Sequence, residues 1–191
     1  MANIFSDNFN RVDSPTLGSN WTPVTGTFEI VSNQAKLTVN PSEGLAKHSA
    51  ANYSTADYTV ESVVNTDTFG GAAGVAGRIN GTSYYGVIAG AGFLRLNRYP
   101  GLNQLGYATT STTGQRTLKL KMEGSAIKAF IDGIELISAT DTVITGAGVA
   151  GLTTLGAVGA SLALWDNFTV DDLFVPFPDE LIQSRRMIDD P

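Results

Sequence analysis

The chain has 191 residues, of which 42% are hydrophobic and only 16% are charged, so it has the composition of one globular domain and not of a disordered chain. Eighteen acidic and twelve basic residues give a formal net charge of −6, and no basic cluster is present, which argues against nucleic acid or an anionic membrane surface as partner. The absence of cysteine excludes disulfides and thiolate metal sites.

The first residues, Met1 to Ser14, contain neither a basic start nor an apolar core, so we expect no secretory signal peptide. No apolar run approaches the roughly 20 residues that a membrane helix requires. We therefore expect a protein that is made in a cytoplasm and acts in water.

Period-two alternation of apolar and polar residues dominates from residue 26 to residue 170 and predicts about twelve short strands. The clearest of them cover residues 27–31, 35–39, 58–64, 75–80, 83–88, 93–99, 117–122, 127–131, 134–138, 148–152 and 161–170. A hairpin is predicted around residues 32–34 (Ser-Asn-Gln), and a two-residue hairpin turn is predicted at Asp132–Gly133. With no helical period and no internal repeat in this stretch, the pattern predicts an all-β sandwich or barrel.

The last twenty residues differ from this body. Residues 171–178 are apolar after their first two aspartates and contain two prolines, which cannot extend a central strand, and residues 179–186 carry the charge pattern of a short helix. We therefore divide the chain into a body at 1–172 and a C-terminal extension or docking arm at 173–191. The apolar residues of the arm that we expect to contact its own domain or a partner are Phe174, Phe177, Leu181 and Ile182.

Two segments resemble a known family. Residues 7–14 with Leu17–Gly18 and Asn20–Trp21, and residues 117–170 with their closing Trp-Asp-Asn-Phe-Thr-Val, are similar to concanavalin A-like (laminin G-like) jelly rolls of bacteria and bacteriophages. The resemblance implies a two-sheet antiparallel jelly-roll sandwich whose first and last strands pair, so that residues 7–9 lie beside residues 166–168. It also implies sugar binding in some members and a structural or adhesive virion role in phage members.

Catalysis on this fold uses two or three carboxylates on one strand, because a spacing of two places them on the same face. Here Glu61 has no second carboxylate at position 59 or 63, and Asp132 and Glu135 flank a predicted turn. His48 is the only histidine; we expect it in a loop, without the motif of a nucleophile elbow. We expect no enzymatic activity and no required cofactor.

A structural calcium ion is one interpretation of the oxygen donors at the predicted junction of the termini. Asp7 and Asp166, with Asn8 and Asn167 beside them, are hard ligands of the kind that calcium prefers. The alternative is that these side chains cap strand ends by accepting hydrogen bonds from backbone N–H groups.

A glycan-binding face is predicted on adjacent strands, because planar polar groups and aromatic rings alternate there with apolar residues. The predicted residues are Arg78, Asn80, Tyr85, Arg95, Asn97 and Tyr99, with Tyr85 taken in place of its neighbour Tyr84. The alternative is an ordinary solvated sheet face. Trp21 and Trp165 are expected in the core or at the seam of the sandwich.

These observations favour a non-enzymatic bacteriophage virion protein, such as a head decoration, fibre or tail component, that displays a lectin-like domain. Its expected partners are other virion proteins or further copies of itself, together with a glycan, and its expected location is a virion assembled in the host cytoplasm. Two alternatives stay open: a free carbohydrate-binding module of a bacterial protein, and a glycoside hydrolase.

Overall fold

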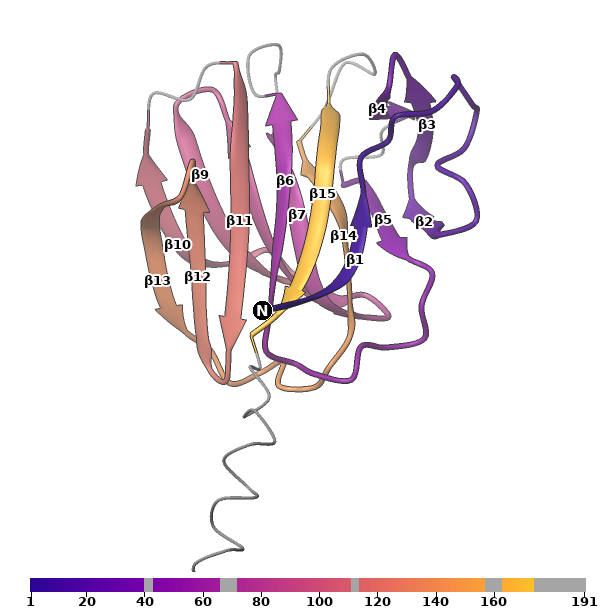
Figure 1. The fold of residues 1–191 in the computed structure, drawn as a ribbon. Helices are drawn as coiled ribbons and strands as arrows, with labels where there is room; N and C mark the ends of the chain where they lie inside the picture. Colours follow the sequence, from indigo (N-terminus) through magenta and orange to yellow (C-terminus); the bar gives the residue numbers. More distant parts are fainter. Residues whose placement is uncertain (40–42, 66–71, 111–113, 157–162, 174–191) are drawn as a thin grey trace, which may run out of the picture.

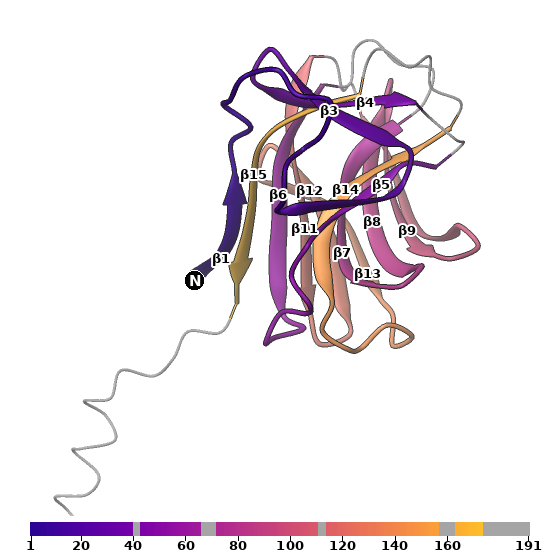
Figure 2. The same cartoon turned by 90° about the vertical axis from the view of Figure 1, so that its right-hand side faces the viewer.

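Two antiparallel β-sheets face each other in the computed structural model, which describes residues 1–39, 43–65, 72–110, 114–156 and 163–173 (Figures 1 and 2). These residues form fifteen strands, so the predicted all-β sandwich is confirmed. No helix within the described ranges is long and apolar enough to cross a membrane.

The first sheet has eight strands. Across it the order is β13 (Ile134–Thr140), β12 (Ala126–Ile131), β11 (Gln115–Glu123), β6 (Tyr58–Asn65), β15 (Leu164–Asp172), β4 (Gln34–Val39) and β3 (Thr27–Val31), and β1 (Ala2–Asp7) also pairs with β15.

The second sheet has seven strands. Its order is β10 (Asn103–Thr109), β9 (Phe93–Tyr99), β8 (Ser83–Gly90), β7 (Ala72–Asn80), β14 (Val149–Leu155), β5 (Leu45–His48) and β2 (Trp21–Thr25).

The core lies between the two sheets and is built by the predicted alternation. Leu118, Leu120 and Met122 of β11 are fully buried, while the lysines between them are partly exposed. Trp165 is also fully buried, and its indole Nε1 donates a hydrogen bond of 2.9 Å to the carbonyl of Gly74 in the opposite sheet. The prediction that Trp165 belongs to the core is therefore confirmed, and Trp21 is buried as well.

Both predicted hairpin turns are confirmed. Ser32 and Asn33 have φ angles of 52° and 63°, and Asp132 and Gly133 have φ angles of 50° and 80°. Two consecutive residues with positive φ match the right-handed twist of the flanking strands, as in a type I′ turn.

The two ends of the body lie side by side, as the family resemblance implies. β1 pairs with β15 so that Asp7 is opposite Phe168 and Ala2 is opposite Asp172 (Figure 1). The predicted docking residues Phe174, Phe177, Leu181 and Ile182 lie outside the described residues.

The alternation did not predict four strands, namely β1, β2, β5 and β10, and of these only the first strand was implied by the family resemblance. β2 and β10 are the edge strands of the second sheet, where one side is unpaired, and β2 contains Pro23. Because β5 ends at His48, the expectation that this histidine lies in a loop is wrong.

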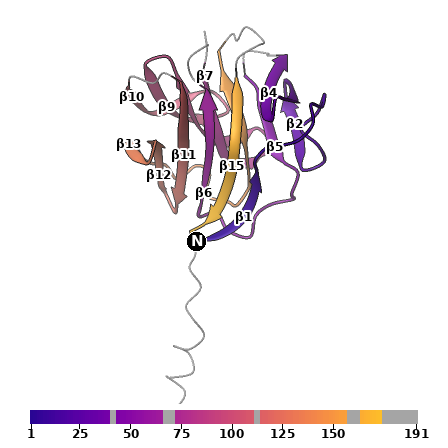
Figure 3. The same cartoon turned by 45° about the horizontal axis from the view of Figure 1, so that its top comes forward.

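The outermost strands β10 and β13 belong to different sheets but lie next to each other along one side of the sandwich (Figure 3). At Gly106 a Cβ atom would collide with the side chain of Ile137, so only glycine allows the two strands to come this close.

Candidate functional site

The outward side of β9 carries the polar residues of the candidate site. Leu94 and Leu96 are fully buried in the core, so the alternating residues Arg95, Asn97 and Tyr99 point to the opposite side of the sheet. We call this side of the seven-stranded sheet, which faces away from the other sheet, the outer face. Three of the six predicted glycan-binding residues are thus on one face and span about 14 Å along one strand.

Two tyrosine rings stack on this outer face. Tyr84 of β8 is opposite Tyr99 of β9, and their ring centroids are 4.2 Å apart with an angle of 8° between the planes. Gly86 lies beneath them, because a Cβ atom at this position would be 3.2 Å from Cε2 of Tyr99. The absence of a side chain at Gly86 therefore lets the rings lie close to the sheet.

An aromatic and cationic cluster lies farther along β9. The guanidinium carbon of Arg95 is 5.5 Å from the ring centroid of Phe93 and 6.0 Å from that of Tyr107 on β10. The two rings are nearly parallel, and Tyr107 is half exposed. Arg95 therefore lies within the range of a cation–π interaction with both rings.

Polar atoms without a partner are concentrated on the same face. Among the described residues, four buried side-chain nitrogen or oxygen atoms have no hydrogen bond of acceptable length and angle: Arg95 Nε, Asn97 Nδ2, Tyr99 Oη and Arg116 Nε. Three of these four belong to alternate residues of β9. Asn97 and Tyr99 are only 1% and 2% exposed, so their polar groups lie where an unmade hydrogen bond is costly.

A small pocket opens beside the tyrosine pair. It has a volume of about 200 Å³, and we call it the outer pocket; Tyr84 and Tyr99 form one wall, and Glu43 and Thr25 contribute polar groups. Pockets for drug-sized ligands usually measure about 300–1,000 Å³, so the outer pocket suits a single small ring. Burial raises the pKa of the Tyr99 phenol to about 12, which keeps it a neutral hydrogen-bonding group.

The prediction for Tyr85 is corrected by the register of β8, which places Tyr84 on the outer face and Tyr85 on the other side. The Tyr85 hydroxyl donates a hydrogen bond of 2.6 Å to Oδ1 of Asp141 and accepts one of 3.2 Å from the backbone N–H of Ile144. Tyr85 is fully buried and holds a loop in place.

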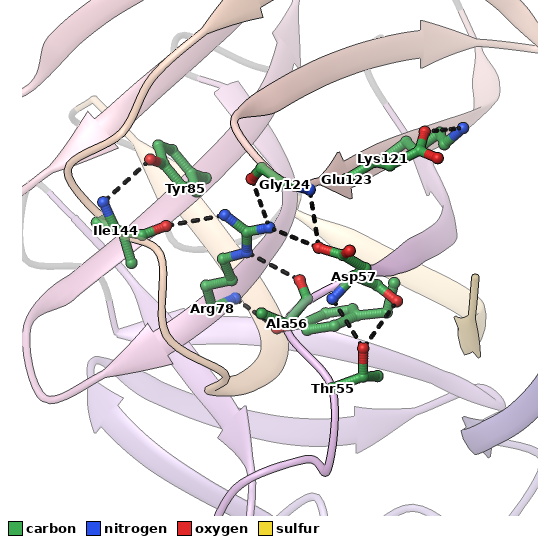
Figure 4. Close-up of polar contacts among 10 residues, drawn as sticks. Thr55, Ala56, Asp57, Arg78, Tyr85, Lys121, Glu123, Gly124 and Ile144 are labelled. Carbon is green, nitrogen blue, oxygen red and sulfur yellow. Dashed lines mark hydrogen bonds and ion pairs between the residues drawn. The ribbon is translucent and has the colours of Figure 1, made fainter. Parts of the chain in front are cut away.

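Arg78 is also inside the protein and not on the outer face. A β-bulge between Gly77 and Asn80 gives Arg78 a φ of 51° and disrupts the alternation on which the prediction depended. Its guanidinium group donates to the carbonyl oxygens of Ala56, Ile144 and Gly124 and to the carboxylate of Asp57 (Figure 4). With 1% exposure, Arg78 ties three loops together at one end of the sandwich.

Asn80, the remaining predicted residue, is exposed at the end of β7. It lines a separate pocket at the end of the sandwich, together with Arg98 and Asn103. This pocket also touches Tyr99, so Asn80 lies near the outer face without belonging to it.

The predicted calcium ligands are engaged with protein groups. Asp7 accepts hydrogen bonds from both terminal nitrogens of Arg11, at 2.7 and 3.0 Å, and from Trp21 Nε1 at 2.8 Å. Asp166 accepts a bond of 2.8 Å from the backbone N–H of Asn167. No group of three or more His, Asp or Glu side chains in the described part of the chain could hold a metal ion. The geometry therefore favours the alternative interpretation, in which these carboxylates support the backbone.

The carboxylate considered for catalysis is paired with a lysine. Glu61 and Lys119 form an ion pair of 2.6 Å across β6 and β11, on the eight-stranded sheet. Asp132 pairs with Arg116, and Glu135 with Lys128, at distances of 3.1 and 2.9 Å. Glu61 and Glu135 lie on strands of the eight-stranded sheet and Asp132 lies in its β12–β13 turn, so these carboxylates do not form a pair on the outer face.

Sequence reasoning missed four residues of this site: Glu43, Tyr84, Phe93 and Tyr107. Tyr84 and Phe93 follow from the alternation once the register of β8 and β9 is known. Glu43 and Tyr107 carried no such signal, because Glu43 precedes a strand of four residues and Tyr107 lies on an edge strand with a bulge.

No protein-family model matches this chain, and no curated protein sequence matches it either. Solved structures with the same fold are many. A carbohydrate-binding module from Bacillus subtilis, CBM66, is similar to this chain at a TM-score of 0.66 and 21% identity over 81% of this chain and 96% of the module.

Two further structures illustrate the range of proteins with this fold. The CBM2 module of the evolved Dit of Lactobacillus casei BL23 phage J-1 has a TM-score of 0.62 and 11% identity over 93% of this chain and 98% of the module. A β-glucanase from Bacillus licheniformis has a TM-score of 0.58 and 13% identity over 89% of this chain and 96% of the enzyme. The fold is therefore that of concanavalin A-like lectins, carbohydrate-binding modules and glucanases.

Proposed function

We propose that this protein is a non-catalytic glycan-binding domain whose binding site is the outer face around Tyr84, Arg95, Asn97 and Tyr99. The observation that carries the proposal is the row of unpartnered polar groups on β9. Each such group costs the folded protein roughly 1–3 kcal/mol unless a partner arrives. Groups of this kind on one strand face are typical of a surface that is completed by a ligand.

The chemistry of the face suits a neutral sugar. The half-exposed ring of Tyr107 offers a flat apolar surface to the C–H groups of a sugar ring, and the partly exposed guanidinium group of Arg95 can bond its hydroxyls. Glu43 in the outer pocket can accept hydrogen bonds from hydroxyls but would repel an anionic group. The net charge of −6 also disfavours an acidic glycan.

A non-catalytic role is supported by the carboxylates. Retaining glycosidases hold two carboxyl groups about 5–5.5 Å apart, and inverting enzymes hold them about 6.5–9.5 Å apart. Among the described residues that line the outer pocket, Glu43 alone carries a carboxylate. Incubation with a polysaccharide panel, followed by an assay for new reducing ends, tests this part; release of reducing ends by the purified protein would contradict it.

Binding is tested with a glycan array and two variants, Tyr99→Phe and Arg95→Ala. The first removes only a hydroxyl oxygen that makes no hydrogen bond of acceptable geometry, and the second removes a guanidinium group that lies over two rings. We expect a glycan bound by the wild type to lose about tenfold or more of its affinity in each variant. Undiminished binding by both variants would show that the outer face is not the site.

Beyond glycan binding, we propose that this domain is displayed on a bacteriophage particle, where it contributes adhesion to a host or environmental glycan. Support comes from the sequence resemblance to phage jelly rolls and from the likeness in fold to a carbohydrate-binding module of a phage protein. The free carbohydrate-binding module remains the alternative, because CBM66 has the same fold.

Removal of the C-terminal residues distinguishes the virion proposal from the free carbohydrate-binding module. Residues 174–191 lie beyond the last described contact of the chain, a hydrogen bond of 3.1 Å from Leu173 N to the carbonyl of Asp57. On the virion proposal, a chain that ends at Leu173 keeps its melting temperature but loses self-association or docking to virion proteins, as measured by light scattering and co-purification with particles. Unchanged assembly after truncation would remove the argument for a docking arm.

A further inference from the structure

The pocket at the end of the sandwich, here called the end pocket, lies next to the outer pocket. It has a volume of about 590 Å³ and is formed by the β7–β8 turn, the β9–β10 turn and the loop at residues 143–147. Tyr99 and Pro100 line both pockets. The two cavities are therefore separated only by the segment in which β9 turns into β10.

The polar groups of the end pocket suit hydroxyls. Asn80, Ser83 and Asn103 bring two amides and a hydroxyl, and Arg98 brings a guanidinium group. Arg98 forms an ion pair through Nη1 with Asp141, so its charge is neutralised from within the protein. This combination of amides, a hydroxyl and a charge-balanced guanidinium group is adapted to neutral polyhydroxyl compounds.

The wall of the end pocket is fixed by buried side chains. The carbonyl of Ile144 accepts a hydrogen bond of 2.8 Å from Arg78, and its N–H donates one of 3.2 Å to Tyr85 (Figure 4). Asp141, at the start of the same loop, accepts bonds from Tyr85 and from the N–H of Val143. A loop held in this way loses little conformational entropy when a ligand binds beside it.

We propose that the end pocket is a second subsite for the same glycan chain, so that a linear oligosaccharide of neutral sugars passes over the exposed Pro100, beside Tyr99, from the outer pocket into the end pocket. The inference rests on the proposed glycan-binding function. Asn80, Arg98 and Asn103 are the contact residues of this subsite. Arg78, Tyr85 and Asp141 are positioning residues, since they act through the loop and through Arg98.

The end pocket can be closed without touching the outer pocket. Gly146 is exposed, its φ is not in the left-handed region, and a Cβ atom there would have no neighbour within 4 Å. A tryptophan at this position can therefore occupy the cavity without backbone strain. Val12, which is 88% exposed and does not line the end pocket, provides the matched control for an added tryptophan.

The experiment uses the full chain and calorimetric titration. Starch, β-glucan, galactan, mannan and fructan are first screened, and the monosaccharide and linear tetrasaccharide of each polysaccharide that binds are then compared. We expect the wild type and Val12→Trp to bind the tetrasaccharide about tenfold or more tighter than the monosaccharide. Gly146→Trp and Asn103→Ala should lose this preference while keeping the affinity for the monosaccharide.

Two results would overturn the inference, and they differ in what they say about the proposed function. If Tyr99→Phe weakens tetrasaccharide binding but Gly146→Trp and Asn103→Ala do not, the outer face binds glycan and the end pocket takes no part. If none of the five polysaccharides binds to the wild type, the proposed function in neutral glycan binding fails and the inference fails with it.

Discussion

The imidazole ring of His48 lies flat against the phenyl ring of Phe5, with ring centroids 3.8 Å apart and an angle of 15° between the planes. Phe5 belongs to β1 in the eight-stranded sheet and His48 to β5 in the seven-stranded sheet, so the stack joins the two sheets at the seam where the chain begins. His48 Nδ1 is also 3.1 Å from the Tyr53 hydroxyl.

The stack predicts a pH-dependent stability. Burial lowers the pKa of His48 below its usual 6.5, so the folded protein resists protonation while the unfolded chain takes up a proton near pH 6.5. The stabilisation that the neutral His48 ring provides is therefore complete above pH 6.5 and is lost as the pH falls below it. We expect the urea midpoint to decrease between pH 7.5 and pH 5.5, a range in which aspartates do not titrate.

His48→Phe keeps an aromatic ring against Phe5 but cannot be protonated. Its urea midpoint should change little over the same range. An equal decrease in this variant and in the wild type would show that another group is responsible.

Tyr58 and Tyr99 can be compared to distinguish a hydroxyl that stabilises the fold from one that we propose binds a ligand. The Tyr58 hydroxyl accepts from the N–H of Arg78 and donates to the carbonyl of Val149, whereas the Tyr99 hydroxyl makes no hydrogen bond of acceptable length and angle. Tyr58→Phe should lower the free energy of unfolding by about 1–2 kcal/mol, and Tyr99→Phe should leave it unchanged or raise it. Equilibrium unfolding in urea measures both. Equal destabilisation by the two variants would mean that Tyr99 is bonded within the folded protein.

Arg78, which is buried and holds three loops together, should be costly to remove. Arg78→Met leaves the carbonyls of Ala56, Gly124 and Ile144 without their donor, and we expect a loss of about 3 kcal/mol or more in the free energy of unfolding. Arg116→Met is the control, because Arg116 pairs with the half-exposed Asp132 and such surface pairs contribute under about 1 kcal/mol. Similar losses in the two variants would contradict the structural role of Arg78.

Asp7 offers a test of the calcium hypothesis. Burial alone would raise its pKa, but hydrogen bonds from Arg11, Trp21 and the N–H of Phe9 outweigh that effect and lower it. The stabilisation should therefore be present above pH 3.8 and disappear as the pH falls below it. Because these donors occupy the carboxylate, we expect the same melting temperature in EGTA and in calcium, whereas Asp7→Asn should lower it. A higher melting temperature in calcium would restore the metal interpretation.

The fold was predictable from strands that bury one face in the core and expose the other, because apolar and polar residues then alternate along the strand. Strict alternation placed β11 and β12 correctly, and the positive-φ turn at Asp132–Gly133 placed the hairpin of β12 and β13. β2 and β10 were missed because an edge strand is paired on one side only, so its sequence tolerates Pro23 and a bulge.

The candidate site was predictable only as far as the alternation holds. Arg95, Asn97 and Tyr99 follow the period of β9, and the structure places them together. The bulge at Arg78 reverses its side, and two adjacent tyrosines at 84 and 85 can be separated only by knowing the register. Glu43 reaches the outer pocket through tertiary structure, which no local pattern encodes.

The hydrogen bond from Leu173 to Asp57 has a consequence for how the domain can be attached. Asp57 is hydrogen-bonded to Arg78, and Arg78 is hydrogen-bonded to Ile144 in the wall of the end pocket. Only these two residues therefore link Leu173, where the described chain leaves the sandwich, to that wall. Ala2, opposite Asp172, is at the same end. Anything tethered through either terminus therefore approaches from the side of the end pocket. If the domain is anchored through a terminus, an oligosaccharide that crosses Pro100 into the end pocket runs toward the anchor, and the bulk of the anchoring protein limits how far the oligosaccharide can extend.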